Sequence, residues 1–230
     1  MKTLSLAVLL TSMALGSTVA AQDKDIDKVD KRLAESGTAF SEIMSVPDKG
    51  IPGSLLDKAE CIVIIPGMVK GGFIVGGQGG KGAVSCRGAN KSGWTAPAMV
   101  EMAGGSVGLQ IGASATDVVM LVMDRKGMES LLKDKFTVGG DASVAAGPVG
   151  RASTAETDAA MKAKILSYSR SRGAFAGVAL KGTTLKQDND ANKALYGKPM
   201  DATAILTGTP SPAGAAPMLQ ALNKYSPAGK

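Results

Sequence analysis

Residues 162–172 alternate between two sets of side chains, one mostly cationic and one mostly small. This pattern restricts the fold of the segment more than any other feature of the chain. One parity holds Lys162, Lys164, Leu166, Tyr168, Arg170 and Arg172, and the other holds Ala163, Ile165, Ser167, Ser169 and Ser171. Successive side chains of a β-strand point to opposite faces. The pattern therefore predicts a strand with four cations and a tyrosine on one face and smaller residues on the other.

Such a face suggests a binding site for anions. A row of positive charge can hold a polyanionic surface, so the predicted lipid- or phosphate-binding residues are Lys162, Lys164, Tyr168, Arg170 and Arg172. The alternative is that Arg170 and Arg172 pair with carboxylates inside the fold, because arginine is the usual residue in such pairs.

The rest of the chain has the pattern of an α+β domain. Short apolar or alternating runs follow one another between residues 61 and 181, and helical patterns lie at both ends, over 23–44, 189–196, 201–206 and 217–225. Many of the 30 glycines fall within or between the strand-like runs, where glycine marks bulges, bends or close backbone approach. We therefore predict a curved, glycine-rich, mostly antiparallel sheet or barrel-like core with helices packed at both chain ends.

The first predicted helix is amphipathic. Its apolar stripe, at helical spacing, is formed by Ile26, Val29, Leu33, Phe40 and Met44. The stripe has two interpretations, which are packing on the domain core and insertion into a membrane through Ile26, Val29, Leu33 and Phe40. Acidic and basic residues cancel along the helix, so we favour core packing.

The first 21 residues resemble an export signal. Lys2 is followed by an apolar run over 4–15 and by the small residues Val19, Ala20 and Ala21. This run is shorter than the ~20 residues that a membrane-spanning helix needs. We expect cleavage of 1–21, which leaves a helix and linker over 22–50 and one domain over 51–230. The mature protein would be periplasmic or secreted, and peripheral on a membrane if it binds one.

Two cysteines, Cys61 and Cys86, occur in the sequence. An even number of cysteines in an exported chain favours one disulfide, and the alternative is two buried free thiols.

Composition excludes several kinds of chemistry. The chain has no histidine, so Ser-His-Asp and Cys-His catalysis and histidine-ligated metals are excluded. Four short segments resemble known functional motifs, but each lacks an essential part of its motif. The motifs are a nucleophile elbow (104–108), a dinucleotide loop (77–82), a Ser/Lys acyl transferase (130–133) and a calcium loop (188–192). We predict no enzyme activity, no cofactor and no metal, and keep a Ser/Lys hydrolase acting through Ser130 as a third class.

Charge and aromatic content limit the partners. The net charge of +6 suits an acidic surface, but only 3% of the residues are aromatic, which leaves little for stacking on bases. Together with the export signal, this argues against nucleic acid as a partner.

Motifs spaced between Ile51 and Leu222 resemble the SYLF-domain family. In order, they are Ile51-Pro52 with Ala59 before the apolar run 62–66, Lys70-Gly71-Gly72-Phe73, Gly76-Gly77 with Gly80, Trp94-Thr95-Ala96-Pro97, residues 108–112, Thr116-Asp117, segments of 145–182, and Asn192 with Tyr196-Gly197. The resemblance implies a lipid-binding domain, with phosphoinositide and acidic-lipid ligands among eukaryotic members. It also implies an N-terminal amphipathic segment that acts at membranes.

Together these observations predict a bacterial, exported, non-catalytic SYLF-type domain that binds lipid or an acidic membrane surface. The alternative is a structural or protein-interaction component of the bacterial cell envelope.

Overall fold

The fold is described from a computed structural model. The structure describes residues 6–46, 50–72, 75–107, 112–124, 127–129, 135–150, 162–171, 174–178, 180 and 182–228.

The described strands form one nine-stranded sheet in the order β5-β9-β3-β2-β1-β4-β7-β6, with β8 also paired to β7. The strands are β1 (Cys61–Gly72), β2 (Val75–Cys86), β3 (Ala98–Val107), β4 (Gly112–Val122), β5 (Lys135–Thr137), β6 (Val144–Ala146), β7 (Ile165–Ser171), β8 (Ala174–Gly177) and β9 (Thr184–Gln187). Every described pair is antiparallel except β6 with β7. The predicted mostly antiparallel sheet is confirmed.

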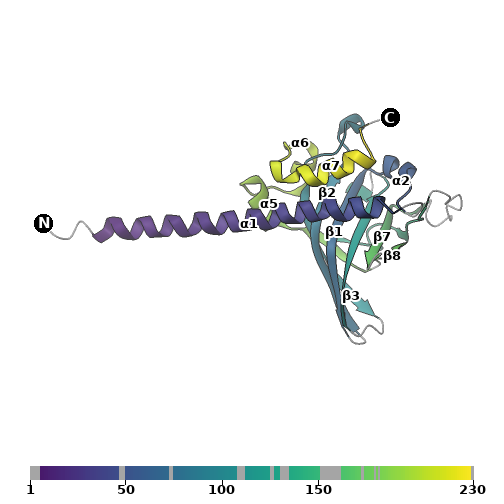
Figure 1. Ribbon diagram of the computed structural model, residues 1–230, viewed down its shortest axis with the longest axis horizontal. Coiled ribbons are helices and arrows are strands. Elements are labelled where there is room, and N and C mark those ends of the chain that lie inside the picture. The colour runs from purple at the N-terminus through teal and green to yellow at the C-terminus, as the bar shows by residue number, and fades with distance from the viewer. Residues whose placement is uncertain are drawn as a thin grey trace.

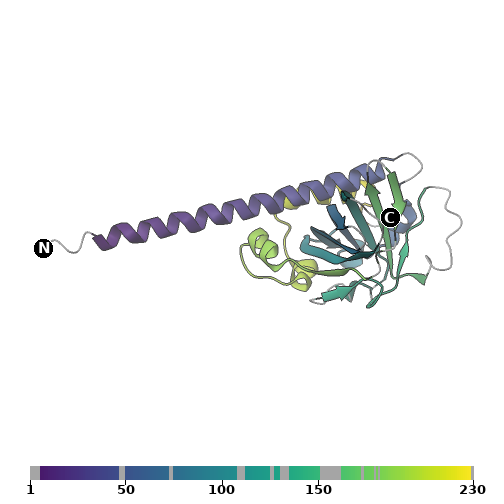
Figure 2. The same ribbon diagram turned by 90° about the horizontal axis from the view of Figure 1, so that it is seen from below.

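The connection between the two outermost strands requires the sheet to curl. Strands β5 and β6 end the sheet path, yet only residues 138–143 join them. A flat path of this kind would be ~34 Å wide at ~4.8 Å per strand, whereas the connection reaches at most ~25 Å. The sheet therefore bends around, as Figure 2 shows beneath α1. The predicted curved, barrel-like α+β core is confirmed.

Each face of the curled sheet buries its own hydrophobic cluster. The inner cluster contains residues from both ends of the sheet together with α6 (Ala202–Gly208), among them Val63, Ile65, Met120, Phe136, Leu185 and Ile205. The outer cluster joins the sheet to α1 (Leu6–Met44), α2 (Gly53–Lys58), α5 (Asn189–Tyr196) and α7 (Ala216–Tyr225), and its sheet residues include Ile62, Ile64, Val119, Leu121 and Leu166. Both faces are covered, which explains why residues 61–65 are apolar without alternation.

Helix α1 lies across the outer face of the sheet, beside α7 (Figures 1 and 2). Val29, Leu33 and Phe40 are at most 3% exposed in the outer cluster, and Ile26 is half-buried. The interpretation as a core-packing helix is therefore confirmed over the described side chains.

The helix continues without a break through residues 6–22, and this end stands away from the sheet in Figure 1. Cleavage of this segment stays a prediction. Within the part of the chain that the structure describes, no helix combines the length and apolar character needed to cross a bilayer.

The C-terminal helices lie close to the ranges predicted from the sequence: α5 matches at both ends, α6 runs to Gly208 instead of 206, and α7 begins at Ala216 instead of 217. The carboxylate of Asp188 accepts the amide of Ala191 at the start of α5, and Asp201 does the same for Ala204 in α6. Gly197, with φ of 71°, ends α5 in the left-handed conformation that favours glycine.

Cys61 and Cys86 face each other across β1 and β2 and are joined by a disulfide. The predicted cysteine pairing is confirmed.

Candidate functional site

Strand β7 has the predicted alternation, but the face with Leu166, Tyr168 and Arg170 is the one that borders the outer hydrophobic cluster. Leu166 and Tyr168 are buried in the outer hydrophobic cluster. Tyr168 is 0% exposed, stacks on Phe175 with ring centroids 5.6 Å apart, and has a raised pKa because of burial. The prediction of one exposed row of cations with Tyr168 among them is therefore wrong. The physical reason is that Phe175 of β8 and the backbone at Gly147 pack against Tyr168, within the cluster that the sheet shares with the helices.

Arg170 lies on the same face, near the far end of β7. Its Nη2 lies 2.8 Å from Oδ2 of Asp117, its partner in β4, and also contacts a carboxylate oxygen of Glu42 in α1. The internal-pairing alternative therefore holds for Arg170. Arg172 lies outside the described residues.

A second ionic cluster attaches α1 to the sheet through Asp188, which is 6% exposed. Its Oδ2 lies 3.1 Å from Nη1 of Arg32 and 2.9 Å from Nζ of Lys81, and Lys81 also lies 3.5 Å from Glu101. Burial acts to raise the pKa of Asp188, but the hydrogen bonds from Lys81 and Ala191 and the charges of Lys81 and Arg32 lower it overall. The hydrogen bond to Asp188 raises the pKa of Lys81. These cations are neutralised within the fold.

Four other lysines gather at one end of the sheet. Lys58 ends α2 just before β1, Lys91 ends the short 3₁₀ helix η1 (Ala89–Lys91) after β2, and Lys162 and Lys164 precede β7. The register places Cys61 opposite both Cys86 and Val122, and Val122 opposite Ile165, so these strand ends lie side by side. We call Lys58, Lys91, Lys162 and Lys164 the lysine end.

The lysine end differs from the other cationic clusters in its lack of neutralisation. Among the described residues, no carboxylate lies within ion-pair distance of these four lysines, and all but the half-buried Lys164 are exposed. Three acids lie near this end: Asp57 accepts a hydrogen bond from Ser226, Asp124 accepts one from the amide of Gly127, and Asp57 and Glu60 both interact electrostatically with Arg87 rather than with these lysines. This end can therefore attract anions.

The sequence analysis predicted Lys162 and Lys164 but missed Lys58 and Lys91. Lys58 lies three residues before β1 and Lys91 lies five residues after β2, and this position just outside a strand is the signal that could have found them. It becomes informative only when the order of the strands is known.

A pocket with a volume of about 480 Å³ opens at the lysine end. Its lining includes Lys91, Arg87, Met128 and Leu206. Arg87 lies 4.0 Å over the ring of Trp94 and donates to the backbone carbonyls of Ser226 and Pro227, so this guanidinium mainly fixes the C-terminal segment.

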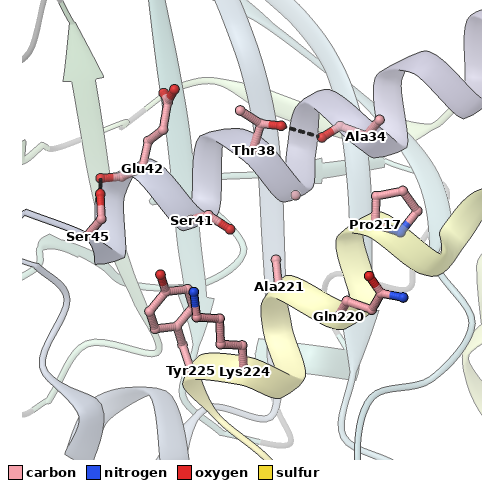
Figure 3. A pocket seen from close by; sticks show the side chains of 11 residues that line it. Ala34, Thr38, Ser41, Glu42, Ser45, Pro217, Gln220, Ala221, Lys224 and Tyr225 are labelled. Atoms are coloured by element: carbon pink, nitrogen blue, oxygen red, sulfur yellow. Dashed lines mark hydrogen bonds between the residues drawn. The ribbon is translucent and has the colours of Figure 1, made fainter.

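A separate groove of about 580 Å³ runs between α1 and α7 (Figure 3). At its floor the helices approach so closely that a Cβ on Gly37 would lie 2.7 Å from the carbonyl oxygen of Pro217. Its charged lining is one carboxylate, Glu42, and one amine, Lys224. Over the described residues, no group of acidic or cysteine side chains could hold a metal ion.

Comparison with known proteins agrees with this architecture. Residues 103–225 match the family described as Ysc84, Las17-binding protein actin regulator. The chain is 34% identical over 200 residues to human SH3 domain-containing YSC84-like protein 1, covering 85% of this chain and 58% of that protein. It is 35% identical over 165 residues to LAS seventeen-binding protein 3 of Saccharomyces cerevisiae (S288c), covering 70% of this chain and 35% of the relative.

The chain thus spans between about a third and three fifths of the length of these relatives. The match to the family extends over more than half of this chain and includes α5, α6 and α7. The protein therefore belongs to the Ysc84 family, the SYLF-domain family that its spaced motifs resemble.

Proposed function

We propose that this domain binds anionic lipid surfaces through the lysine end and catalyses no reaction. The observation that carries the proposal is the contrast between two sets of cations. Arg32, Lys81 and Arg170 have carboxylate partners, whereas the lysines of the lysine end have none among the described residues. Charges without partners are the ones that remain available to an external anion.

The expected binding energy is modest but sufficient for reversible attachment. A lysine near an anionic membrane contributes about 1 kcal/mol, so four would contribute about 4 kcal/mol. Strands β2, β1, β4 and β7 are neighbours about 4.8 Å apart, which spreads the lysines over ~14 Å and lets them meet separate head groups. Lys162 and Lys164 keep their predicted role, while Tyr168 and Arg170 are not part of the proposed site.

Co-sedimentation with vesicles tests the site. Phosphatidylcholine vesicles with phosphatidylglycerol should bind the mature chain, and vesicles without it should not. Replacing Lys162 and Lys164 by Gln should weaken binding about 30-fold, since two lysines contribute about 2 kcal/mol.

The matched control replaces Lys193 and Lys198 by Gln. Both are exposed, lie in or just after α5, and have no carboxylate partner among the described residues. This pair removes the same charge and should leave binding unchanged, as should Arg170→Ala. An equal loss in both lysine pairs would show that net charge alone drives binding and would contradict the site.

The location of the protein is part of the proposal. The signal-like segment 1–21 would direct it to the periplasm or the outside, peripheral on a membrane. Mass spectrometry of the exported protein should find a new N-terminus near Ala21 or Gln22. Exported protein that retains Met1 would contradict cleavage.

The second candidate is a protein-interaction component of the cell envelope. Relatives carry names that describe Las17 binding and SH3 domains. In this chain the feature that favours it is Val69, a strand residue with 52% exposure on the outer face, paired with Gly79 and Ala115. A photo-crosslinking residue at position 69 should form a protein adduct in intact cells, and no adduct would count against this candidate.

A further inference from the structure

The pocket at the lysine end has the composition of a small-molecule site. Its volume of about 480 Å³ lies within the range of ligand pockets, ~300–1,000 Å³, which are mostly apolar with a few polar groups. Apolar atoms come from Cys86, Met128 and Leu206, of which Cys86 and Leu206 are at most 5% exposed. These residues can contact a hydrocarbon chain.

Lys91 occupies the rim of this pocket in an unusual backbone conformation. Asn90 and Lys91 have φ of 56° and 57°, and they are the two non-glycine residues with positive φ in the described part of the chain. Lysine rarely adopts this left-handed region, and such strain persists mainly where the surrounding structure uses it for a ligand or a switch. The conformation belongs to a turn in which the amide of Lys91 donates to the carbonyl of Gly88 and the amide of Gly88 donates to the carbonyl of Gly93, and this turn places Lys91 at the pocket.

The Lys91 ammonium is available to an anion. Its Nζ donates to the backbone carbonyl of Asp57 over 3.3 Å, which leaves two of its three donors. Glu60 also lines the pocket, and the Arg87 guanidinium lies within electrostatic reach of the carboxylates of both Asp57 and Glu60, so it offsets part of their charge. Charge and lining together favour a ligand with an anionic head and an apolar chain.

We infer that this pocket binds a single-chain anionic amphiphile such as a fatty acid, with its head group at Lys91 and its chain against Met128 and Leu206. The inference rests on the proposed function, because Lys91 belongs to the lysine end. It goes further than the proposed function, which concerns attachment of the lysine end to a lipid surface, because it assigns a single ligand molecule to a pocket. A purely ionic partner would leave the apolar floor unused, and a cationic amphiphile would be repelled at the rim.

Calorimetric titration of the mature chain with dodecanoate tests the inference. The dodecanoate concentration is kept below the value at which micelles form. Trp94 provides a second signal, because it is the single tryptophan and lies under Arg87, a pocket residue. Dodecanoate should bind saturably at one site. Two control compounds should bind at least tenfold more weakly. Dodecyltrimethylammonium has the same hydrocarbon chain with the opposite charge, and acetate has the carboxylate head group without the chain.

Two variants separate the pocket from general stability. Lys91→Gly should weaken dodecanoate binding at least tenfold while raising the melting temperature, because glycine tolerates the left-handed conformation. Thr207→Trp places a large ring in the pocket from an exposed position of α6 and should also weaken binding at least tenfold. A purely structural role for Lys91 would leave the affinity unchanged in Lys91→Gly.

The outcomes distinguish this inference from the proposed function. Lys162→Gln with Lys164→Gln should weaken vesicle binding and leave dodecanoate affinity as it is. No saturable dodecanoate binding, equal binding of the cationic amphiphile, or wild-type affinity in Lys91→Gly would each overturn the inference. None of those results would change the expected binding to vesicles.

Discussion

Replacing Asp188 by asparagine should destabilise the protein by about 2 kcal/mol at neutral pH. The carboxylate is 6% exposed and contacts both Arg32, which is 18% exposed, and Lys81, which is 49% exposed. A hydrogen bond to a charged group contributes about 1.5–3 kcal/mol, but the half-exposed Lys81 can turn to water, so the loss of Arg32's partner dominates. Asparagine preserves the helix cap, so capping adds little to the loss.

The effect should depend on pH in a defined direction. The folded protein lowers the pKa of Asp188, so its ionised form stabilises the fold above the unfolded pKa of about 3.9. That contribution is lost as the pH falls through the folded pKa. The wild type and Asp188→Asn should therefore differ at pH 7 and converge in acid.

Urea denaturation followed by circular dichroism at several pH values measures this difference. Thermal unfolding at pH 7 should show a decrease of about 4–8 °C for a chain of this size. Asp190→Asn, an exposed acid two residues further along α5, is the matched control and should change stability little. A destabilisation that stays constant down to pH 2, or none at pH 7, would refute the assigned role of the Asp188 cluster.

Two further predictions concern the core. Unfolded, unreduced protein should show no free thiol, and two titratable thiols would rule out the disulfide. The double variant Cys61→Ser with Cys86→Ser should lower the free energy of unfolding by about 3.5 kcal/mol, according to the chain-entropy account of a 25-residue loop. Leu33→Ala should cost about 2–5 kcal/mol, because Leu33 is 0% exposed on the packed face of α1. A change below about 1 kcal/mol in chemical denaturation would mean that α1 does not pack on the sheet in solution.

The repeating patterns in the sequence predicted local structure well. The period of two over 162–172 identified β7, and the helical stripe through Val29, Leu33 and Phe40 identified the packed face of α1. Such periods depend on residues close in the chain and on the fixed geometry of strands and helices. The ends of α5 are set just as locally, by the Asp188 side chain that accepts the amide of Ala191 and by the left-handed conformation of Gly197.

The sequence could not show which strand face would be exposed. The alternation of Leu166, Tyr168 and Arg170 was correct, but the first two are buried in the outer cluster. Arg170 contacts Glu42 of α1, more than a hundred residues earlier in the chain. Arg170 could be assigned to an internal ion pair only after the fold had brought Glu42 and Asp117 to it.

The glycines show the same limit. A Cβ on Gly82 would lie 1.9 Å from the carbonyl oxygen of Ile64, whereas a Cβ on Gly77, in the same strand, would meet nothing within 4 Å. Both belong to the glycine-rich strand β2, and only the contacts made in the folded sheet distinguish the position that packing restricts to glycine.

The candidate site itself is a product of strand order. The lysine end is formed by residues that lie far apart in the sequence, namely Lys58, Lys91 and the pair Lys162 and Lys164. They come together because β2, β1, β4 and β7 are neighbours in the sheet. Side-chain periodicity fixes the direction in which each residue points within its own element. Long-range burial and backbone pairing decide which elements lie side by side. The sequence alone therefore determined the strands and helices, and the tertiary structure decided which charges remain free to bind.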